Sequence, residues 1–296
     1  MRGKPGTIAT RLELLTGLVT LCTLWGLTYV VIKIGLRDAR PVGFAAWRAL
    51  LGAAVLSASA LALKRPFPRQ LRTHGHAAVL GLTNVAGLLG LMNLGLTRVP
   101  AGEASLLIYT QPLWVSLLAA TVLGEQLTIR RAAGLILGFS GAVAVLAPQF
   151  QAGRADAWWA YVALLTGALV WATSAIYFRR IHEHVDLSWV AALQSLYGAI
   201  PLLAGWWWFE GLAPPRLTWG FVAALGYVGT MSSGLCQILW FWLLKQREAT
   251  LVGISVYLVP PFAVFFGIML LGERPGLNLA IGALLVLAGL YVTRKG

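Results

Sequence analysis

The side chains that most often carry catalysis lie outside the long apolar runs of this 296-residue sequence. All ten Asp and Glu residues stand at the ends of those runs or between them, and His74, His76, His182 and His184 are assigned to connecting loops. An enzyme embedded in a membrane needs a nucleophile, a base or a metal cluster near the interface. No run contains a Ser–His pair, a metal-spaced cluster or paired acids. Catalytic residues, a metal site and cofactors are therefore not expected, and a lipid-modifying membrane enzyme is kept as an alternative only.

One cation, Arg48, lies well inside an apolar run, about five residues or 8 Å past its start at the helical rise of ~1.5 Å per residue. Its side chain could extend to the membrane surface, make a buried structural contact, or hold the carboxylate of a substrate. These three interpretations remain open at this point. Lys33, near the end of the first run, is expected to extend to the surface.

Aromatic and small polar side chains recur on single faces of the expected helices, because residues three, four or seven positions apart share a face. We predict that these side chains line a substrate cavity: Trp25, Thr28, Tyr29, Asn84, Ser105, Tyr109, Trp171, Ser174, Ser233, Gln237 and Tyr257. Ordinary helix packing or helix–helix hydrogen bonding is the alternative for each, since a polar side chain in hydrocarbon needs a partner. Most of the 13 Trp residues, Trp240 among them, are expected in aromatic belts at the membrane interfaces.

Two prolines lie near the middle of long apolar runs. Pro112 and Pro260 each lack a backbone N–H, which leaves the carbonyl four residues earlier without its helical partner. In a membrane such a carbonyl needs water or a ligand. We therefore predict kinks at both prolines that act as hinges and present acceptors to an amino group. A kink that serves packing alone is the alternative.

The apolar runs predict the elements that position these residues. The sequence is 58% hydrophobic and 11% charged, with a mean hydropathy of +0.77, whereas a soluble protein carries about 25% charge. A helix needs roughly 20 apolar residues to span a membrane, so we predict an all-α integral membrane protein with ten transmembrane helices. They are expected at 12–34, 43–63, 77–97, 103–123, 130–148, 157–179, 187–209, 218–244, 250–271 and 277–293.

Most of the 23 Lys and Arg residues fall in alternate segments between these runs, beginning with the N-terminal segment. Because cytoplasmic segments are enriched in Lys and Arg, both the N- and the C-terminus are predicted to be cytoplasmic. This bias explains the net charge of +13. The expected partner is therefore the lipid bilayer, and no nucleic acid is expected.

The sequence repeats itself in two halves, 1–148 and 149–296. Trp25 corresponds to Trp171, Pro112 to Pro260, and the Gly-Glu pairs at 124–125 and 272–273 correspond to each other. Each half holds five predicted helices, an odd number, so the second half must enter the membrane from the opposite side. Inverted repeats of this kind surround a central cavity in many transporters. A duplicated bundle without transport activity is the alternative.

Trp25–Gly26 near the middle of the first helix, Pro112 within the fourth and Gly124–Glu125 at its end make the sequence resemble the drug/metabolite transporter superfamily. Within it the chain is most similar to EamA-type exporters, in particular to those of aromatic amino acids in bacteria. The resemblance implies a ten-helix protein, functional as a monomer, that exports amino acids and related metabolites across the bacterial inner membrane.

We therefore expect an exporter of aromatic and other neutral amino acids that works by alternating access. A roomy cavity without full charges predicts low affinity and broad selectivity. Since no acid stands in the middle of a predicted helix, a facilitator or a gradient-driven exporter is favoured over a carboxylate-based proton relay. A multidrug or nucleotide-sugar transporter of the same superfamily is the alternative, although a phosphorylated substrate would need several cations in the cavity.

Overall fold

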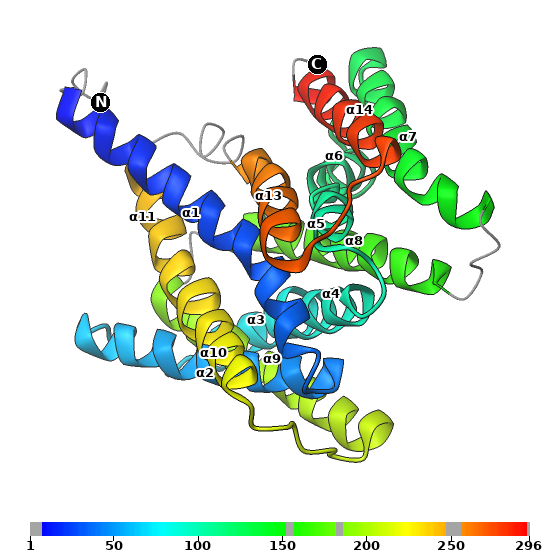
Figure 1. Ribbon diagram of the computed structural model, residues 1–296. Helices are drawn as coiled ribbons and strands as arrows, with labels where there is room; N and C mark the ends of the chain where they lie inside the picture. Colours follow the sequence, from blue (N-terminus) through cyan, green and yellow to red (C-terminus); the bar gives the residue numbers. More distant parts are fainter. Residues whose placement is uncertain (1–7, 152–156, 182–185, 247–255, 295–296) are drawn as a thin grey trace.

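In a computed structural model the described residues, 8–151, 157–181, 186–246 and 256–294, form a bundle of helices joined by short loops (Figure 1), and no strand occurs within these ranges. The first half of the chain contains α1 (Ile8–Gly35), α2 (Pro41–Ala62), α3 (Leu71–Leu80), the π-helix η1 (Gly81–Gly87), α4 (Leu88–Leu96), α5 (Ala101–Ile108), α6 (Gln111–Val122) and α7 (Ile129–Gln151). The second half contains α8 (Trp158–Ile181), α9 (Leu187–Glu210), α10 (Trp219–Gly226), the π-helix η3 (Tyr227–Leu235), α11 (Cys236–Gln246), the 3₁₀-helix η4 (Val256–Leu258), α13 (Val259–Leu271) and α14 (Leu277–Arg294).

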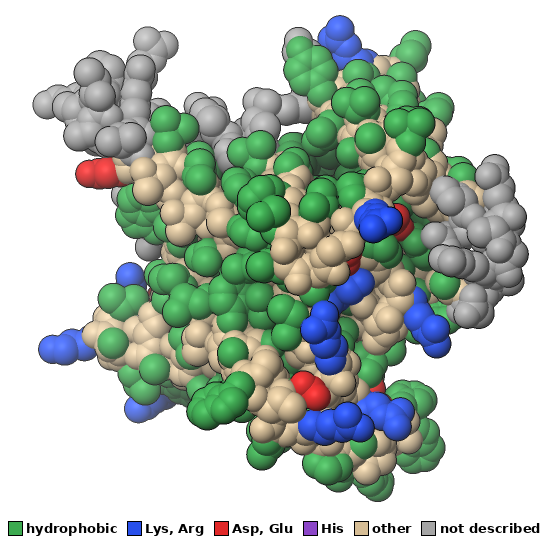
Figure 2. Space-filling view, in the orientation of Figure 1, with side chains coloured by type: hydrophobic (Ala, Val, Ile, Leu, Met, Phe, Trp, Pro, Cys, Tyr) green, Lys and Arg blue, Asp and Glu red, His purple; other side chains and the backbone are tan. Residues whose placement is uncertain are grey.

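Eight helical segments of this bundle, of 19 to 26 residues, are long and apolar enough to cross a membrane, and 259–271 and 277–293 are shorter apolar helices. Together they fall at the positions of the ten predicted runs, although the start of the run at 250–271 lies outside the described residues. Figure 2 shows hydrophobic side chains over much of the visible surface, with Lys and Arg gathered in a few places. The all-helical fold class is confirmed, while ten membrane crossings remain a prediction.

Several of the long segments are interrupted, which the sequence pattern did not predict. η1 separates α3 from α4, and η3 separates α10 from α11. The expected kinks at the two prolines are instead helix breaks. Helix α5 ends at Ile108 and α6 begins at Gln111, so Pro112 stands in the first turn of a new helix, and Pro260 does the same in α13. A proline fits there because the first N–H groups of a helix have no partner within it.

The main helix contacts join the two halves of the chain. Helix α2 packs against α9, and α7 packs against α14, which lies beside it in Figure 1. Two further contacts have the same form in both halves. Helix α1 packs against α13, and α8, which holds the place of α1 in the second half, packs against α6, which holds the place of α13 in the first. The π-helices follow the same rule, since η1 contacts α9 and η3 contacts α2.

Glycines allow the closest of these contacts. A Cβ atom on Gly141 of α7 would stand 2.6 Å from the carbonyl oxygen of Gly282 in α14, and a Cβ on Gly282 would stand 2.8 Å from the Gly141 carbonyl oxygen. Small residues at a helix interface let two backbones approach within a membrane. Gly141 and Gly282 therefore serve the close packing of α7 against α14.

The placement of two histidines differs from the sequence analysis. His74 and His76 lie in α3, which begins before the predicted helix, and not in a loop. His74 Nδ1 is 2.6 Å from the Tyr197 hydroxyl, and His76 Nδ1 is 2.7 Å from the Tyr177 hydroxyl. These contacts connect α3 to α9 and α8. Outside the described residues lie His182 and His184.

Candidate functional site

A cavity of about 760 Å³ lies between the two halves of the chain. This volume is within the range of pockets that hold small molecules, ~300–1,000 Å³. Of the residues predicted from the sequence, these line it: Trp25, Thr28, Tyr29, Arg48, Asn84, Tyr109, Pro112, Trp171, Ser174, Ser233, Gln237 and Tyr257. The cavity therefore brings together side chains from segments that are far apart in the sequence.

Two of the residues predicted for the site lie elsewhere. Ser105 is fully buried, and its hydroxyl donates to the Gly102 carbonyl at 2.8 Å. Ser105 does share a helix face with Tyr109, whose N–H donates to the Ser105 carbonyl at 2.9 Å, but it stands one turn earlier in α5, where all residues are buried. Pro260 is buried at the start of α13 and does not contact the cavity.

Aromatic rings form much of the cavity wall. The Trp25 ring of α1 lies 5.7 Å from the Trp240 ring of α11, and the Trp171 ring of α8 lies 5.8 Å from the Tyr109 ring, nearly perpendicular to it. Trp25 and Trp171, which correspond in the repeat, therefore stand on walls from opposite halves. Trp240, expected in an interfacial belt, instead lines the cavity. Such a surface accepts apolar and aromatic groups of varied shape.

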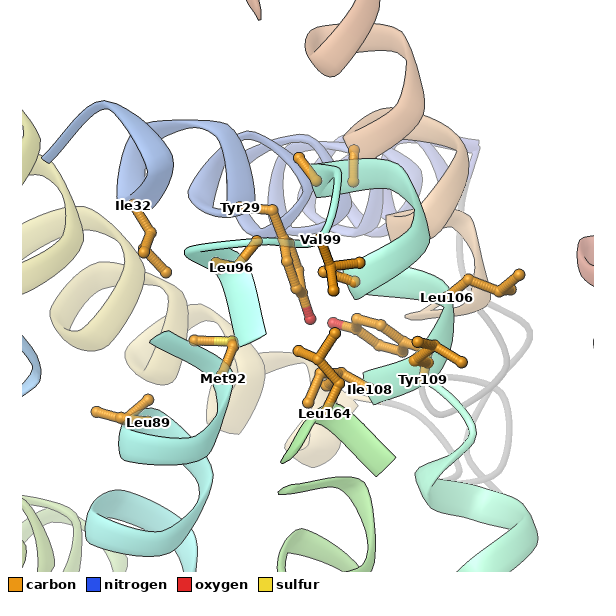
Figure 3. Close-up of a cluster of buried hydrophobic side chains, with 14 of the residues drawn as sticks. Tyr29, Ile32, Leu89, Met92, Leu96, Val99, Leu106, Ile108, Tyr109 and Leu164 are labelled. Carbon is orange, nitrogen blue, oxygen red and sulfur yellow. The ribbon is translucent and has the colours of Figure 1, made fainter. Parts of the chain in front are cut away.

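Two tyrosines stand where the cavity meets the packed core. Figure 3 shows the Tyr29 and Tyr109 hydroxyls pointing toward each other, with Val99, Leu96 and other apolar side chains around them. Tyr29 is 5% exposed and Tyr109 is 6% exposed. The cavity therefore ends at this level, because the side chains beyond the two tyrosines are closely packed.

Arg48 is buried in the cavity wall. It is only 6% exposed, and its Nε and Nη2 atoms donate to the Ser233 and Ser232 hydroxyls at 3.1 and 3.2 Å. Its Nη1 atom is buried without a hydrogen-bond partner. Of the three interpretations left open by the sequence, extension to the membrane surface is wrong. The two serines are consecutive, and both reach Arg48 from the π-helix η3, whose wider turn differs from that of an α-helix.

A matching polar pair stands on the opposite wall. Asn84 of η1 donates to Gln194 of α9 at 3.4 Å, and Gln194 is 6% exposed. In the predicted repeat Gln194 corresponds to Arg48. Each of the two walls joins a long helix to a π-helix, but only one of them carries a charge. Gln194 and Ser232 were not predicted for the cavity. The signal for Gln194 was its correspondence with Arg48, whereas nothing in the apolar pattern marked Ser232.

The cavity reaches the surface at one end of the molecule. Arg179, at the end of α8, belongs to its lining, and its side chain is 53% exposed. Arg179 Nη2 stands 3.1 Å from Glu125 Oε1, so this cation has an acidic partner. Leu187 and Thr293 line the same end. If the N-terminus is cytoplasmic as predicted, this opening faces the cytoplasm.

The other end is closed by a charged cluster that the sequence did not predict. Lys33 Nζ lies 3.2 Å from Glu273 Oε1 and donates to the Val99 carbonyl at 2.9 Å. Lys33 was expected to extend to the membrane surface, and it has these two partners instead. The Ala101 N–H donates to Glu273 Oε1 at 2.8 Å, and the Gly102 N–H reaches Oε2 at 3.5 Å. Glu273 therefore connects the end of α13 to the N-terminus of α5.

Charge in the cavity is one-sided. None of the described residues in its lining is Asp or Glu, and Arg48 and Arg179 are its cations. Glu103, the acid buried in the first turn of α5, is 8% exposed and accepts a hydrogen bond from the Tyr161 hydroxyl at 2.7 Å outside the cavity. Within the ranges that the structure describes, no group of His, Cys, Asp and Glu could hold a metal ion. The cavity can therefore hold a largely apolar molecule, with amides, hydroxyls and one guanidinium for its polar group.

Comparison with known proteins matches both halves of the chain to one protein family. The profile of the EamA-like transporter family matches residues 14–147 and 158–294. An uncharacterized transporter of Bacillus subtilis, YoaV, is 26% identical over 280 residues, which cover 95% of this chain and 96% of that protein. A crystal structure of 23% sequence identity has a similar fold, with a TM-score of 0.66 over 96% of this chain and 98% of that one.

Two other similar proteins have names that mention a substrate. A probable terminal-alkyne amino-acid exporter of Streptantibioticus cattleyicolor is 28% identical over 282 residues, covering 94% of this chain and 92% of that protein. A probable amino-acid metabolite efflux pump of Escherichia coli is also 28% identical, over 281 residues that cover 92% of this chain and 91% of that protein.

Proposed function

Because the chain belongs to the EamA-like transporter family of the drug/metabolite transporter superfamily, we propose that it exports aromatic and other neutral amino acids, and related metabolites, by alternating access. Membership confirms the resemblance seen in the sequence. It makes the chain a multi-pass membrane transporter of small molecules and not an enzyme. The substrate and the transport mechanism are the proposal.

The observation that carries the proposal is the composition of the cavity wall. Trp25 and Trp171 offer flat apolar surfaces to a side chain, while Arg48 can donate to a carboxylate. Asn84 and Gln237 add amide groups for the remaining polar atoms. The names of the Streptantibioticus and Escherichia relatives agree with a substrate of this chemistry. A nucleotide sugar fits less well, because its phosphates would meet a single unpaired cation.

Alternating access follows from the proposed inverted repeat of residues 1–148 and 149–296. The exchanged contacts of α1 with α13 and of α6 with α8 support it, as do the interruptions at η1 and η3. We place ten helices in the bacterial inner membrane, with both termini in the cytoplasm, and treat the monomer as the functional unit. In this topology the structure is open to the cytoplasm and closed to the outside at Glu273.

Counterflow into proteoliposomes tests the proposal. Purified protein is reconstituted into vesicles that are loaded with an unlabelled amino acid. Uptake of labelled phenylalanine, tryptophan, leucine and threonine is then compared with uptake of one organic dication. We expect uptake of several amino acids and none of the dication. Uptake of the dication alone would contradict the proposal and favour a multidrug transporter. The control for membrane insertion is Trp219→Ala, at a position that is 90% exposed.

A further inference from the structure

We propose that the cavity prefers organic monocarboxylates whose amino group carries no charge, such as N-acylated amino acids, over zwitterions and cations, and that Arg48 makes this selection. The inference rests on the proposed function, because it narrows the substrate class of the same cavity. It follows from the one-sided charge of the cavity wall and not from the names of the relatives.

The charge of Arg48 is uncompensated. The guanidinium is 6% exposed, its hydrogen-bond partners are two neutral hydroxyls, and no carboxylate among the described residues lies within 4.0 Å of it. A buried charge without a counter-ion is costly, and Nη1 still has its N–H groups to donate. A substrate carboxylate at Nη1 would supply both the missing charge and the missing acceptor, through a charge-assisted hydrogen bond.

The other end of a zwitterion, its ammonium group, finds no counter-ion in the described lining. An ammonium group needs acceptors, and the described residues of the lining provide no carboxylate for it. The Gln194 side-chain oxygen Oε1 already accepts from Asn84 Nδ2 at 3.4 Å. An ammonium within a few ångströms of a carboxylate bound to Arg48 would also be repelled by the guanidinium. A zwitterion therefore gains from one end and loses from the other, whereas a monoanion only gains.

The cavity also has room for the group that replaces the ammonium. Its volume of about 760 Å³ exceeds the needs of a free amino acid, and Leu88, Met92 and Val115 give its wall an apolar surface. The hydrocarbon part of an acyl group can be buried there, while its amide oxygen and N–H can pair with the side-chain amides of Asn84 and Gln237 in the same lining. The aromatic rings could instead attract a cation through their faces, and this opposite preference is one outcome of the test.

The experiment compares three labelled probes of nearly equal shape in proteoliposomes. N-acetylphenylalanine is a monoanion, phenylalanine is a zwitterion and phenylalaninamide is a cation. Transport is measured by exchange with the membrane potential held at zero by potassium and valinomycin, so that the charge of the probe affects binding only. For the unmodified protein we expect the rates to fall in the order anion, zwitterion, cation, with at least a tenfold difference between the first and the last.

Arg48→Gln places the amide of its counterpart Gln194 at this position, and we expect it to reduce the difference between the three probes to less than threefold. Arg48→Lys keeps the charge and should keep the order. Arg98→Gln removes a charge from an exposed position outside the cavity and should change nothing. If Arg48→Gln does not fold, the order measured for the unmodified protein and for Arg48→Lys is a test by itself.

The outcomes separate the two proposals. If phenylalanine is transported fastest, amino-acid export stands and the inference is overturned. If the cation is fastest, or if Arg48→Gln leaves the anion preference intact, the role given to Arg48 is wrong. If none of the three probes is transported, both proposals fail.

Discussion

Glu273 is the residue through which closure of the end opposite the cavity mouth, the outer end in the proposed topology, can be tested. Its carboxylate is 16% exposed, pairs with Lys33 at 3.2 Å and accepts the Ala101 N–H at 2.8 Å. Glu273→Gln keeps the shape of the side chain and one acceptor but removes the charge. A hydrogen bond to a charged group contributes about 1 kcal/mol more than one between neutral groups, and a carboxylate at a helix N-terminus adds ~0.3–1 kcal/mol. The loss is therefore about 1–2 kcal/mol, or a five- to thirtyfold shift toward the state that is open to the outside.

The assay uses Leu96→Cys as a reporter, because Leu96 is 2% exposed and lies at the closed end. Cys22 and Cys236 are first replaced by Ala. In right-side-out vesicles, Glu273→Gln should raise the rate of labelling by a membrane-impermeant maleimide about five- to thirtyfold. Glu125→Gln is the matched control, since Glu125 is its counterpart in the repeat and pairs with Arg179 and Arg131 at the other end. Unchanged labelling in Glu273→Gln, or an equal rise in Glu125→Gln, would refute the reasoning.

Three further predictions concern transport and stability. Trp171→Ala should lower amino-acid counterflow about tenfold, because it removes an aromatic contact of about 0.5–1.5 kcal/mol together with part of the cavity wall. The control, Trp219→Ala, should have no effect. Equal rates for the two variants would mean that Trp171 serves packing. Gly141→Leu should lower the melting temperature in detergent, since overpacking costs about 1–3 kcal/mol. Gly75→Ala should not lower it, because no atom lies within 4 Å of the added Cβ. An unshifted melting curve for Gly141→Leu would contradict the close packing of α7 and α14. Counterflow should persist when an ionophore removes the pH gradient, and strict dependence on that gradient would instead direct attention to the buried Glu103.

The sequence predicts the helices well because the membrane restricts what can cross it. A spanning segment must be apolar for about 20 residues, so composition alone marks its position. The same holds for the face that carries Trp25, Thr28 and Tyr29, because α1 is continuous and its 3.6-residue period runs without a break. Ser105 shows the limit of this reasoning. It shares a helix face with Tyr109, but all residues of α5 are buried, so a shared face did not bring it to the cavity.

The interruptions themselves leave no trace in hydropathy. A π-helix is as apolar as the α-helix around it, so nothing marked Ser232 and Ser233 as neighbours on one surface. Trp240 was assigned to an interface because depth along a helix was the available criterion, yet its ring packs against Trp25. The pairing of Lys33 with Glu273 joins residues from the two halves of the chain. Such contacts depend on how helices are packed, and a single sequence does not encode that in any local pattern.

Selection and access are assigned to different elements of the fold. Arg48 and its serines lie on α2 and η3, which pack against each other, whereas Glu273 joins α13 to α5. A change at Glu273 therefore alters how often the outer end opens without altering the charge that a substrate meets in the cavity. A change at Arg48 does the reverse. The proposed repeat can thus provide two equivalent openings, and we propose that one departure from it, the arginine at the position of Gln194, decides which molecules use them.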